Sequence, residues 1–202
     1  GTPGNAWLSF LGYSGTKRSP SLYITNNGVL HASWSEGSTL TGTPVSASSP
    51  TILTVNKWTH IALVKNGTTM KLYADGIEIY SVACLATIDV PDNAYWFGKS
   101  DQQFGGTLDE VRFWSIARTQ SQINASRFTE LIGNETGLLA NFDFNQGVAG
   151  GNNATITTVI NKANSAINGT LTNFTKTGTS SNFVANTISS FSIHSLATIA
   201  FF

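Results

Sequence analysis

The sequence predicts an all-β fold, a sandwich of two antiparallel sheets with one short connecting helix. Short apolar runs recur along the chain, glycine-containing turns separate them, and Lys and Glu, which are typical of soluble helices, are scarce. With 202 residues, 41% of them hydrophobic, the chain is long enough to bury the core of one large β domain. We expect residues 1–202 to form this single domain.

The first predicted hairpin lies in "SLYITNNGVLHASWS". Leu22 and Ile24 alternate with polar neighbours, as expected for a half-buried strand. Asn26-Asn27-Gly28 supplies residues that tolerate positive φ, so the chain turns there and returns through residues 29–34.

Two further turns divide residues 58–82 into three antiparallel strands. Asn66-Gly67 separates the first strand from the second, and Asp75-Gly76 separates the second from the third. Asn-Gly and Asp-Gly pairs adopt the positive φ angles of two-residue hairpin turns, so consecutive strands are expected to pair.

One helix is predicted after two strands at 95–99 and 107–116. Thr119 and Gln122 have the spacing of a capping box, in which each side chain bonds the backbone of the other residue. An apolar stripe then precedes Gly133, which is expected to end the helix. This stripe consists of Ile123, Phe128, Leu131 and Ile132. Later strands are expected at 137–144, 155–160, 169–175 and 188–202.

Four segments occur in a familiar order. They are "NKWTHIALVKNGTTMKLYADGIEIYS", "YWFGKSDQQFGGTLDEVRFWSIARTQSQI", "GLLANFDFNQGVAGG" and "NKANSAINGTLTNFTKTGTSSNFV". Together they resemble the laminin-G-like, concanavalin A-like jelly-roll domains of bacterial surface and secreted proteins. The resemblance covers most of residues 56–184 and implies two sheets packed face to face, with a possible ligand site in loops at one edge. Members include lectins, adhesion modules and carbohydrate-binding appendages of enzymes, which implies an extracellular or cell-surface location.

The chain departs from that family at its start. Family members usually have another strand pair before the segment that "WLSFLG" resembles, and this pair is missing. Residues 187–202 have strand character and would fill the gap by folding back on the sheet. Alternatively, another copy of the protein would fill it, because an open sheet edge beside an apolar core seeks a partner.

The charge balance argues against polyanionic partners. The 11 basic residues offset 11 acidic ones, so the chain has no long-range field to attract nucleic acid or an anionic membrane. No run approaches the roughly 18 apolar residues of a membrane span. The six glycosylation sequons are interpreted as chance matches in a chain rich in Asn and Thr. They begin at Asn66, Asn124, Asn134, Asn153, Asn168 and Asn173.

The acidic residues do not form a catalytic pair. Glycosidases need two carboxylates that address one bond, and those with this sandwich align them in a Glu-x-Asp-x-x-Glu strand, which is absent here. Asp109 and Glu110 are adjacent on a predicted strand and would point to opposite faces. We expect Glu110 and Arg112 either to form a local ion pair or to satisfy backbone groups, because buried charges need partners. We expect the protein not to be an enzyme. His31, His60 and His194 are likewise not beside a nucleophile motif.

A calcium site is a second hypothesis, because the family that the chain resembles includes members that bind calcium through loop oxygens. Asp101 and Gln102 precede one strand, and Asp92 and Asn93 lie one loop earlier. Calcium prefers carboxylate and amide oxygens, so Asp101, Asp92 and Asn93 are the predicted metal ligands. Alternatively, these residues are only the polar residues of turns.

Carbohydrate binding requires aromatic faces for stacking and polar groups for the hydroxyls. Trp58 and Trp114 lie in the segments shared with the family and are expected in the core. Trp34 and Trp96 lie nearer loops, and with Gln102 they are the predicted ligand-binding residues, although both tryptophans could equally belong to the core.

The sequence therefore predicts a non-catalytic extracellular module that binds carbohydrate or acts in adhesion. One alternative is a structural subunit of a surface filament or adhesin, joined to other copies by strand exchange. A second alternative is an enzyme that degrades polysaccharides.

Overall fold

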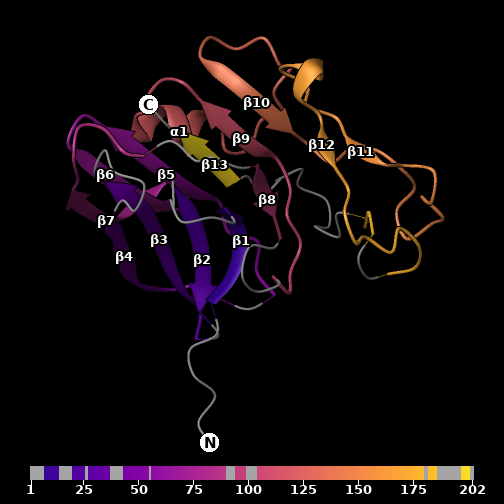
Figure 1. Ribbon diagram of the computed structural model, residues 1–202, viewed down its shortest axis with the longest axis horizontal. Coiled ribbons are helices and arrows are strands. Elements are labelled where there is room, and N and C mark those ends of the chain that lie inside the picture. Colours follow the sequence, from indigo (N-terminus) through magenta and orange to yellow (C-terminus); the bar gives the residue numbers. More distant parts are fainter. Residues whose placement is uncertain are drawn as a thin grey trace, which may run out of the picture. The chain divides into compact units, whose positions relative to one another are not determined.

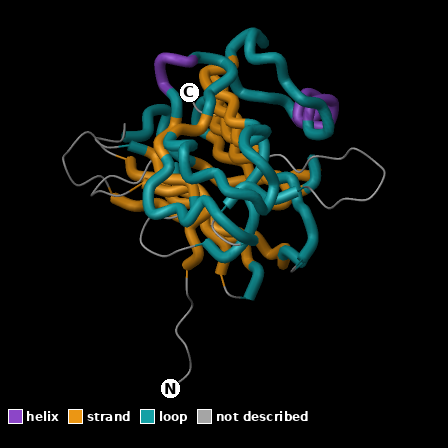
Figure 2. Tube along the Cα trace, turned by 90° about the vertical axis from the view of Figure 1, so that its right-hand side faces the viewer, coloured by secondary structure: helices purple, strands orange, loops and turns teal. Residues whose placement is uncertain are grey.

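The computed structural model describes residues 7–13, 20–25, 27–36, 43–54, 56–89, 94–98, 104–179, 182–185 and 197–200. The chain divides into two compact units, Gly1–Leu108 and Asp109–Phe202. Strands make up almost all of the regular structure in the described residues (Figures 1 and 2). The predicted all-β class is confirmed.

The first unit contains a five-stranded antiparallel sheet in the order β4-β3-β2-β1-β8. Its strands are β1 (Trp7–Tyr13), β2 (Ser21–Thr25), β3 (Val29–Glu36), β4 (Thr43–Ile52) and β8 (Tyr95–Phe97). β4 was not predicted, because its sequence is rich in Ser and contains Pro44 and Pro50. Proline lacks an N–H donor, and β4 tolerates it because this strand lies at the edge of the sheet.

The register gives this sheet two unlike faces. Leu22 pairs with Ala32, and at the next positions Ser21 pairs with Ser33. Because successive side chains of a strand point to opposite faces, the two pairs lie on different faces. The apolar face carries four side chains that are 0% exposed, which are Leu22, Leu30, Ala32 and Trp34. The opposite side, called the polar face, carries Ser21, Tyr23, His31, Ser33 and Ser48.

Three further strands of the first unit are joined by tight turns. They are β5 (Ile61–Asn66), β6 (Thr69–Ala74) and β7 (Ile77–Ala83), each antiparallel to the next. Asp75 and Gly76 have φ angles of 49° and 78°, as a type I′ turn requires, and Gly67 has a φ of 54°. The predicted hairpins are therefore confirmed, and they bury Leu63, Met70 and Leu72.

In the second unit, β9 (Val111–Trp114) pairs antiparallel with β10 (Leu138–Phe142) and parallel with β13 (Ala197–Ala200). The predicted strand at 107–116 is longer than the observed β9. Glu110 has a φ of 51°, which is incompatible with an extended strand. β13 lies within residues 187–202, and the completion of the sandwich by this segment stays a prediction.

The predicted helix is shorter than expected. In α1 (Gln120–Ser126), the Gln122 backbone N–H donates to Thr119 Oγ1 at 3.2 Å, and the Thr119 N–H donates to Gln122 Oε1 at 2.9 Å, so the capping box is confirmed. The helix ends at Ser126 instead of Gly133. The Arg112 guanidinium donates a hydrogen bond to the Ser126 carbonyl oxygen at 2.9 Å, which satisfies one of the free carbonyls at a helix end. Ile123 is buried, whereas Ile132 is 77% exposed.

Hydrogen bonds from buried asparagine side chains stabilise the rest of the second unit, where regular structure is sparse. Only β11 (Thr158–Val159), β12 (Gly169–Thr170) and a 3₁₀ turn (Ser165–Ile167) occur between residues 143 and 179. Asn161 Oδ1 accepts the backbone N–H groups of Asn141, Ala163 and Asn164. Asn153 donates to Asn182 Oδ1 at 2.8 Å and to the Val148 carbonyl oxygen at 2.9 Å. These side chains replace the backbone ladder that longer strands would form.

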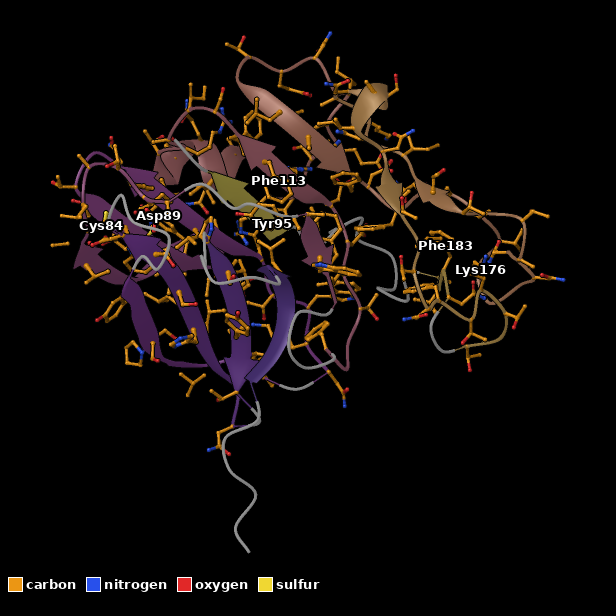
Figure 3. The ribbon with its side chains drawn as sticks, in the orientation of Figure 1. Cys84, Asp89, Tyr95, Phe113, Lys176 and Phe183 are labelled. Carbon is orange, nitrogen blue, oxygen red and sulfur yellow. The ribbon has the colours of Figure 1, made fainter. Side chains whose placement is uncertain are left out.

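Lys176 and Phe183 (Figure 3) are each joined by a backbone hydrogen bond to the loop at residues 150–153. The Gly150 N–H donates to the Phe183 carbonyl oxygen at 2.8 Å, and the Asn153 N–H donates to the Lys176 carbonyl oxygen at 2.7 Å. Within the described chain, no helix is long and apolar enough to cross a membrane.

Candidate functional site

Trp96 is the exposed aromatic residue of the first unit's polar face. It lies on the three-residue edge strand β8 and pairs with Gly12 of β1. Its side chain is 38% exposed, and glycine at the paired position places no side chain beside the indole. A flat aromatic surface at the edge of a sheet is therefore open to a ligand.

Small hydroxyl side chains continue inward from Trp96. Leu11 pairs with both Phe97 and Leu22, so Gly12, Trp96 and Ser21 fall on the same face. Ser21 and Ser33 are buried, and the Oγ atoms of both have no hydrogen-bond partner in the described structure. A buried hydroxyl without a partner costs about 1–3 kcal/mol, and at 0% and 1% exposure neither hydroxyl is open to a ligand from solvent.

Tyr23 and His31 form the next row of the polar face. Their ring centroids lie 6.1 Å apart at an angle of 58°, and His31 Nδ1 lies 2.9 Å from Ser48 Oγ. Both rings are buried. They pack the sheet and are not themselves stacking surfaces, so among the side chains described on this face Trp96 is the accessible ring.

Trp34, the other predicted stacking residue, is in the core. It lies on the apolar face, is 0% exposed and donates from Nε1 to Glu36 Oε1 at 2.8 Å. The interpretation of Trp34 as an exposed ligand-binding residue is therefore corrected. Its hydrogen bond to Glu36 satisfies the polar end of the indole, which allows the whole ring to be buried.

The remaining predicted binding residues lie outside the described residues. These are Gln102 for the ligand and Asp101, Asp92 and Asn93 for calcium. Among the residues that the structure describes, no group of three or more His, Cys, Asp or Glu side chains is placed to hold a metal ion. Calcium binding by this chain stays a prediction.

Glu110 and Arg112 form the predicted ion pair. Arg112 Nη2 and Nε donate to Glu110 Oε2 at 2.9 and 3.2 Å, and both side chains are 0% exposed. Burial raises the pKa of the Glu110 carboxyl, and the Arg112 charge opposes this shift. Arg112 also donates to the carbonyl oxygens of Ser126 and Thr129, so the pair fixes the end of α1. A buried carboxylate used in this way is scaffold and not an acid or base that meets a substrate.

The other chemically notable residues are structural too. Trp114 is 1% exposed, as predicted, whereas Trp58, which was also expected in the core, is only half-buried. The Arg118 guanidinium lies 4.1 Å from the ring centre of Trp114. His60 and Cys84 are buried, and Cys84 carries a free thiol (Figure 3).

One of the six sequons is excluded by burial. Asn153 is 2% exposed, and its amide oxygen and nitrogen both form hydrogen bonds. The other five sequon asparagines are exposed.

A protein of known structure resembles the chain in fold. A proposed carbohydrate-binding protein from Bacteroides ovatus superposes with a TM-score of 0.62 and 19% identity, over 81% of this chain and 47% of that protein. The chain thus spans about half the length of that relative. An S-layer domain-containing protein from Clostridium thermocellum matches with a TM-score of only 0.33 and 16% identity, over 62% of this chain and 64% of that one, and no inference is drawn from it.

No curated protein sequence matches the chain. A family model described as the Concanavalin A-like lectin/glucanases superfamily matches residues 2–124, which is more than half of the sequence. The chain belongs to this superfamily.

Proposed function

We propose that the chain is a non-catalytic, extracellular carbohydrate-binding module, and that Trp96 is the surface on which a sugar ring stacks. The observation that carries this proposal is the exposed indole of Trp96 beside Gly12. An aromatic face packs well against the C–H groups of a sugar ring.

Two further facts support the proposal. The superfamily includes lectins by its description, and the Bacteroides ovatus protein, which shares the fold, is a proposed carbohydrate-binding protein. The superfamily also includes glucanases. However, the acidic pair of this chain is unsuited to hydrolysis, because Glu110 is fully buried and is held by Arg112.

A glycan array with the wild-type chain and Trp96→Ala tests this function. Phe174→Ala is the matched control, because Phe174 is an exposed aromatic (40%) of the second unit. We expect wild type and Phe174→Ala to bind the same glycans and Trp96→Ala to lose them. The array ligands should remain intact after incubation. Release of sugar by the purified chain would contradict the non-catalytic assignment.

A calcium site belongs to the same proposal. Addition of Ca²⁺ is expected to strengthen glycan binding if Asp101, Asp92 and Asn93 hold the ion beside Gln102, and titration calorimetry with CaCl₂ measures this directly. If CaCl₂ gives no heat of binding and a chelator leaves the glycan affinity unchanged, the proposed calcium site is wrong.

The second candidate function is a subunit of a surface filament or adhesin joined by strand exchange. It is favoured by the parallel pairing of β13 with β9, because a strand contributed by a distant segment can come equally from another copy. Deletion of residues 187–202 tests it. We expect the shortened chain to be destabilised and to be rescued by a peptide of that sequence, whereas a stable monomer would contradict the exchange.

A further inference from the structure

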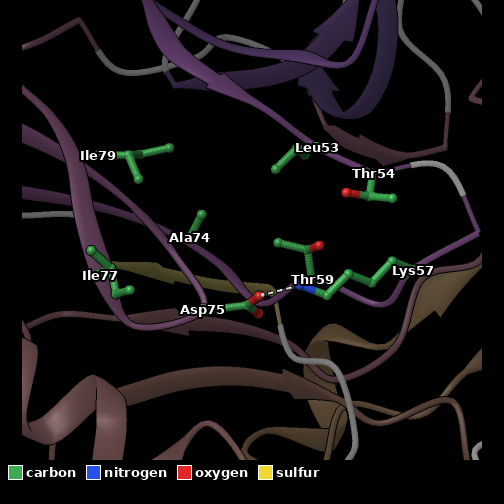
Figure 4. Close-up of a pocket in the computed structure, with 8 residues that line it drawn as sticks. All are labelled: Leu53, Thr54, Lys57, Thr59, Ala74, Asp75, Ile77 and Ile79. Carbon is green, nitrogen blue, oxygen red and sulfur yellow. Dashed lines mark hydrogen bonds and ion pairs between the residues drawn. The ribbon is translucent and has the colours of Figure 1, made fainter.

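The first unit contains a pocket whose lining includes none of the predicted binding residues (Figure 4). Its volume is about 320 Å³. That is at the small end of the range for ligand sites, about 300–1,000 Å³, so it suits one small ring. The pocket lies between the end of β4, the chain leading into β5 and the β6–β7 turn. It is lined by Leu53, Thr54, Lys57, Thr59, Ala74, Asp75, Ile77 and Ile79.

The polar wall of this pocket is an ion pair. Lys57 Nζ lies 3.3 Å from Asp75 Oδ2. Asp75 Oδ1 accepts the His60 backbone N–H at 3.0 Å, and the Asp75 N–H donates to the His60 carbonyl oxygen at 2.8 Å. These two bonds and the tight turn hold the Asp75 carboxylate, so Asp75 positions the Lys57 ammonium group at the mouth of the pocket.

The opposite wall is aliphatic. Ile77 is 64% exposed, and Ile79 and Leu53 are half-buried. Ala74, which is buried, lies among them (Figure 4). The hydroxyls of Thr54 and Thr59 complete the lining, and each can both donate and accept a hydrogen bond.

The charge of the pocket selects among ligands. Lys57 and Asp75 cancel, so a charged ligand would be attracted by one partner and repelled by the other. An ammonium group has three N–H donors, and Asp75 uses one of them. A neutral hydroxyl can accept from Lys57 while its own O–H donates to Asp75 Oδ2. A ring with hydroxyls on its rim and C–H groups on its face matches both walls.

We infer that this pocket is a separate subsite for one neutral, hydroxylated sugar ring. The inference rests on the proposed function of carbohydrate binding and adds a second site and a ligand class to it. In this subsite, Lys57 and Asp75 hold two neighbouring hydroxyls, Thr59 bonds a third, and Ile77 contacts the C–H face of the ring.

NMR titration of the full chain with glucose, galactose, mannose and glucuronate tests the subsite. We expect a neutral sugar to shift the backbone amide signals of Thr59, Asp75 and Ile77. Lys57→Met and Thr59→Val are each expected to weaken its binding by about tenfold, as expected for loss of a hydrogen bond to a sugar hydroxyl. Lys71→Met is the matched control, because Lys71 forms a similar ion pair with Glu78 at 2.8 Å outside the pocket, and it should leave the affinity unchanged.

The same titration of Trp96→Ala separates this inference from the proposed function. Shifts of the pocket amides that persist in Trp96→Ala support an independent subsite. If longer glycans bind through Trp96 while Lys57→Met and Thr59→Val bind like wild type, the subsite is wrong and the proposed function stands. Tighter binding of glucuronate than of every neutral sugar would overturn the ligand class, and no shift with any sugar would overturn the subsite.

Discussion

Trp34 and Trp96 lie on opposite faces of the same five-stranded sheet. Trp34 shares the apolar face with Leu22 and Ala32, whereas Trp96 shares the polar face with Ser21. Trp34 is fully buried and Trp96 is 38% exposed. Side-chain direction alternates along a strand, so the two tryptophans have different roles although both lie near loops.

Their different positions predict different effects on stability. Trp34→Ala removes a fully buried indole and leaves a cavity, so it should lower the free energy of unfolding by about 3–5 kcal/mol. Trp96→Ala removes an exposed ring and should lower it by less than ~1 kcal/mol. Urea denaturation followed by circular dichroism measures both. Equal losses for the two variants would contradict the assignment of faces.

The buried ion pair predicts strong coupling between its partners. Arg112→Met leaves the Glu110 carboxylate buried and unpaired, and should cost about 3–5 kcal/mol of stability. The double variant Glu110→Gln, Arg112→Met should be more stable than Arg112→Met alone, because it removes the unpaired charge. Thermal unfolding of the wild type, Glu110→Gln, Arg112→Met and the double variant completes the double-mutant cycle. Additive losses would show that the two side chains do not depend on each other.

The buried amide of Asn161 predicts a local role in the second unit. Its Oδ1 accepts three backbone N–H groups, so Asn161→Ala leaves buried donors without a partner at a cost of about 1–3 kcal/mol or more. Hydrogen exchange should become faster at Asn141 and Ala163 and stay unchanged in β5–β7. Unchanged protection at Asn141 would contradict this role.

Burial also controls the reactivity of Cys84. Burial raises the pKa of its thiol, so less thiolate is present at pH 8 than for an exposed cysteine. We expect the thiol to react slowly with a disulfide reagent in the native state and rapidly in urea. Rapid reaction of the native protein would place Cys84 at the surface.

Local signals in the sequence predicted much of this fold. The Asp75-Gly76 turn and the Thr119 capping box follow from contacts between near neighbours, and both are confirmed. β4 was missed because Ser and Pro are poor strand formers, and its edge position, which tolerates proline, is a property of the whole sheet.

The candidate site was less predictable because it depends on distant pairing. The exposure of Trp96 follows from its pairing with Gly12, which lies far away in the sequence. The pocket of Lys57 and Asp75 likewise requires β4 and the β6–β7 turn to meet. Neither relationship has a local motif, so the sequence indicated an aromatic residue but not the surface around it.

Calorimetric titration of Trp96→Ala with the best neutral glycan from the array is the most direct test of the central claim. Loss of the aromatic surface should remove about 1.5–3 kcal/mol of apolar contact, which corresponds to an affinity roughly 10 to 100 times lower. Phe174→Ala should bind as the wild type does. A Trp96→Ala variant that is folded and binds the glycan as tightly as the wild type would contradict the account.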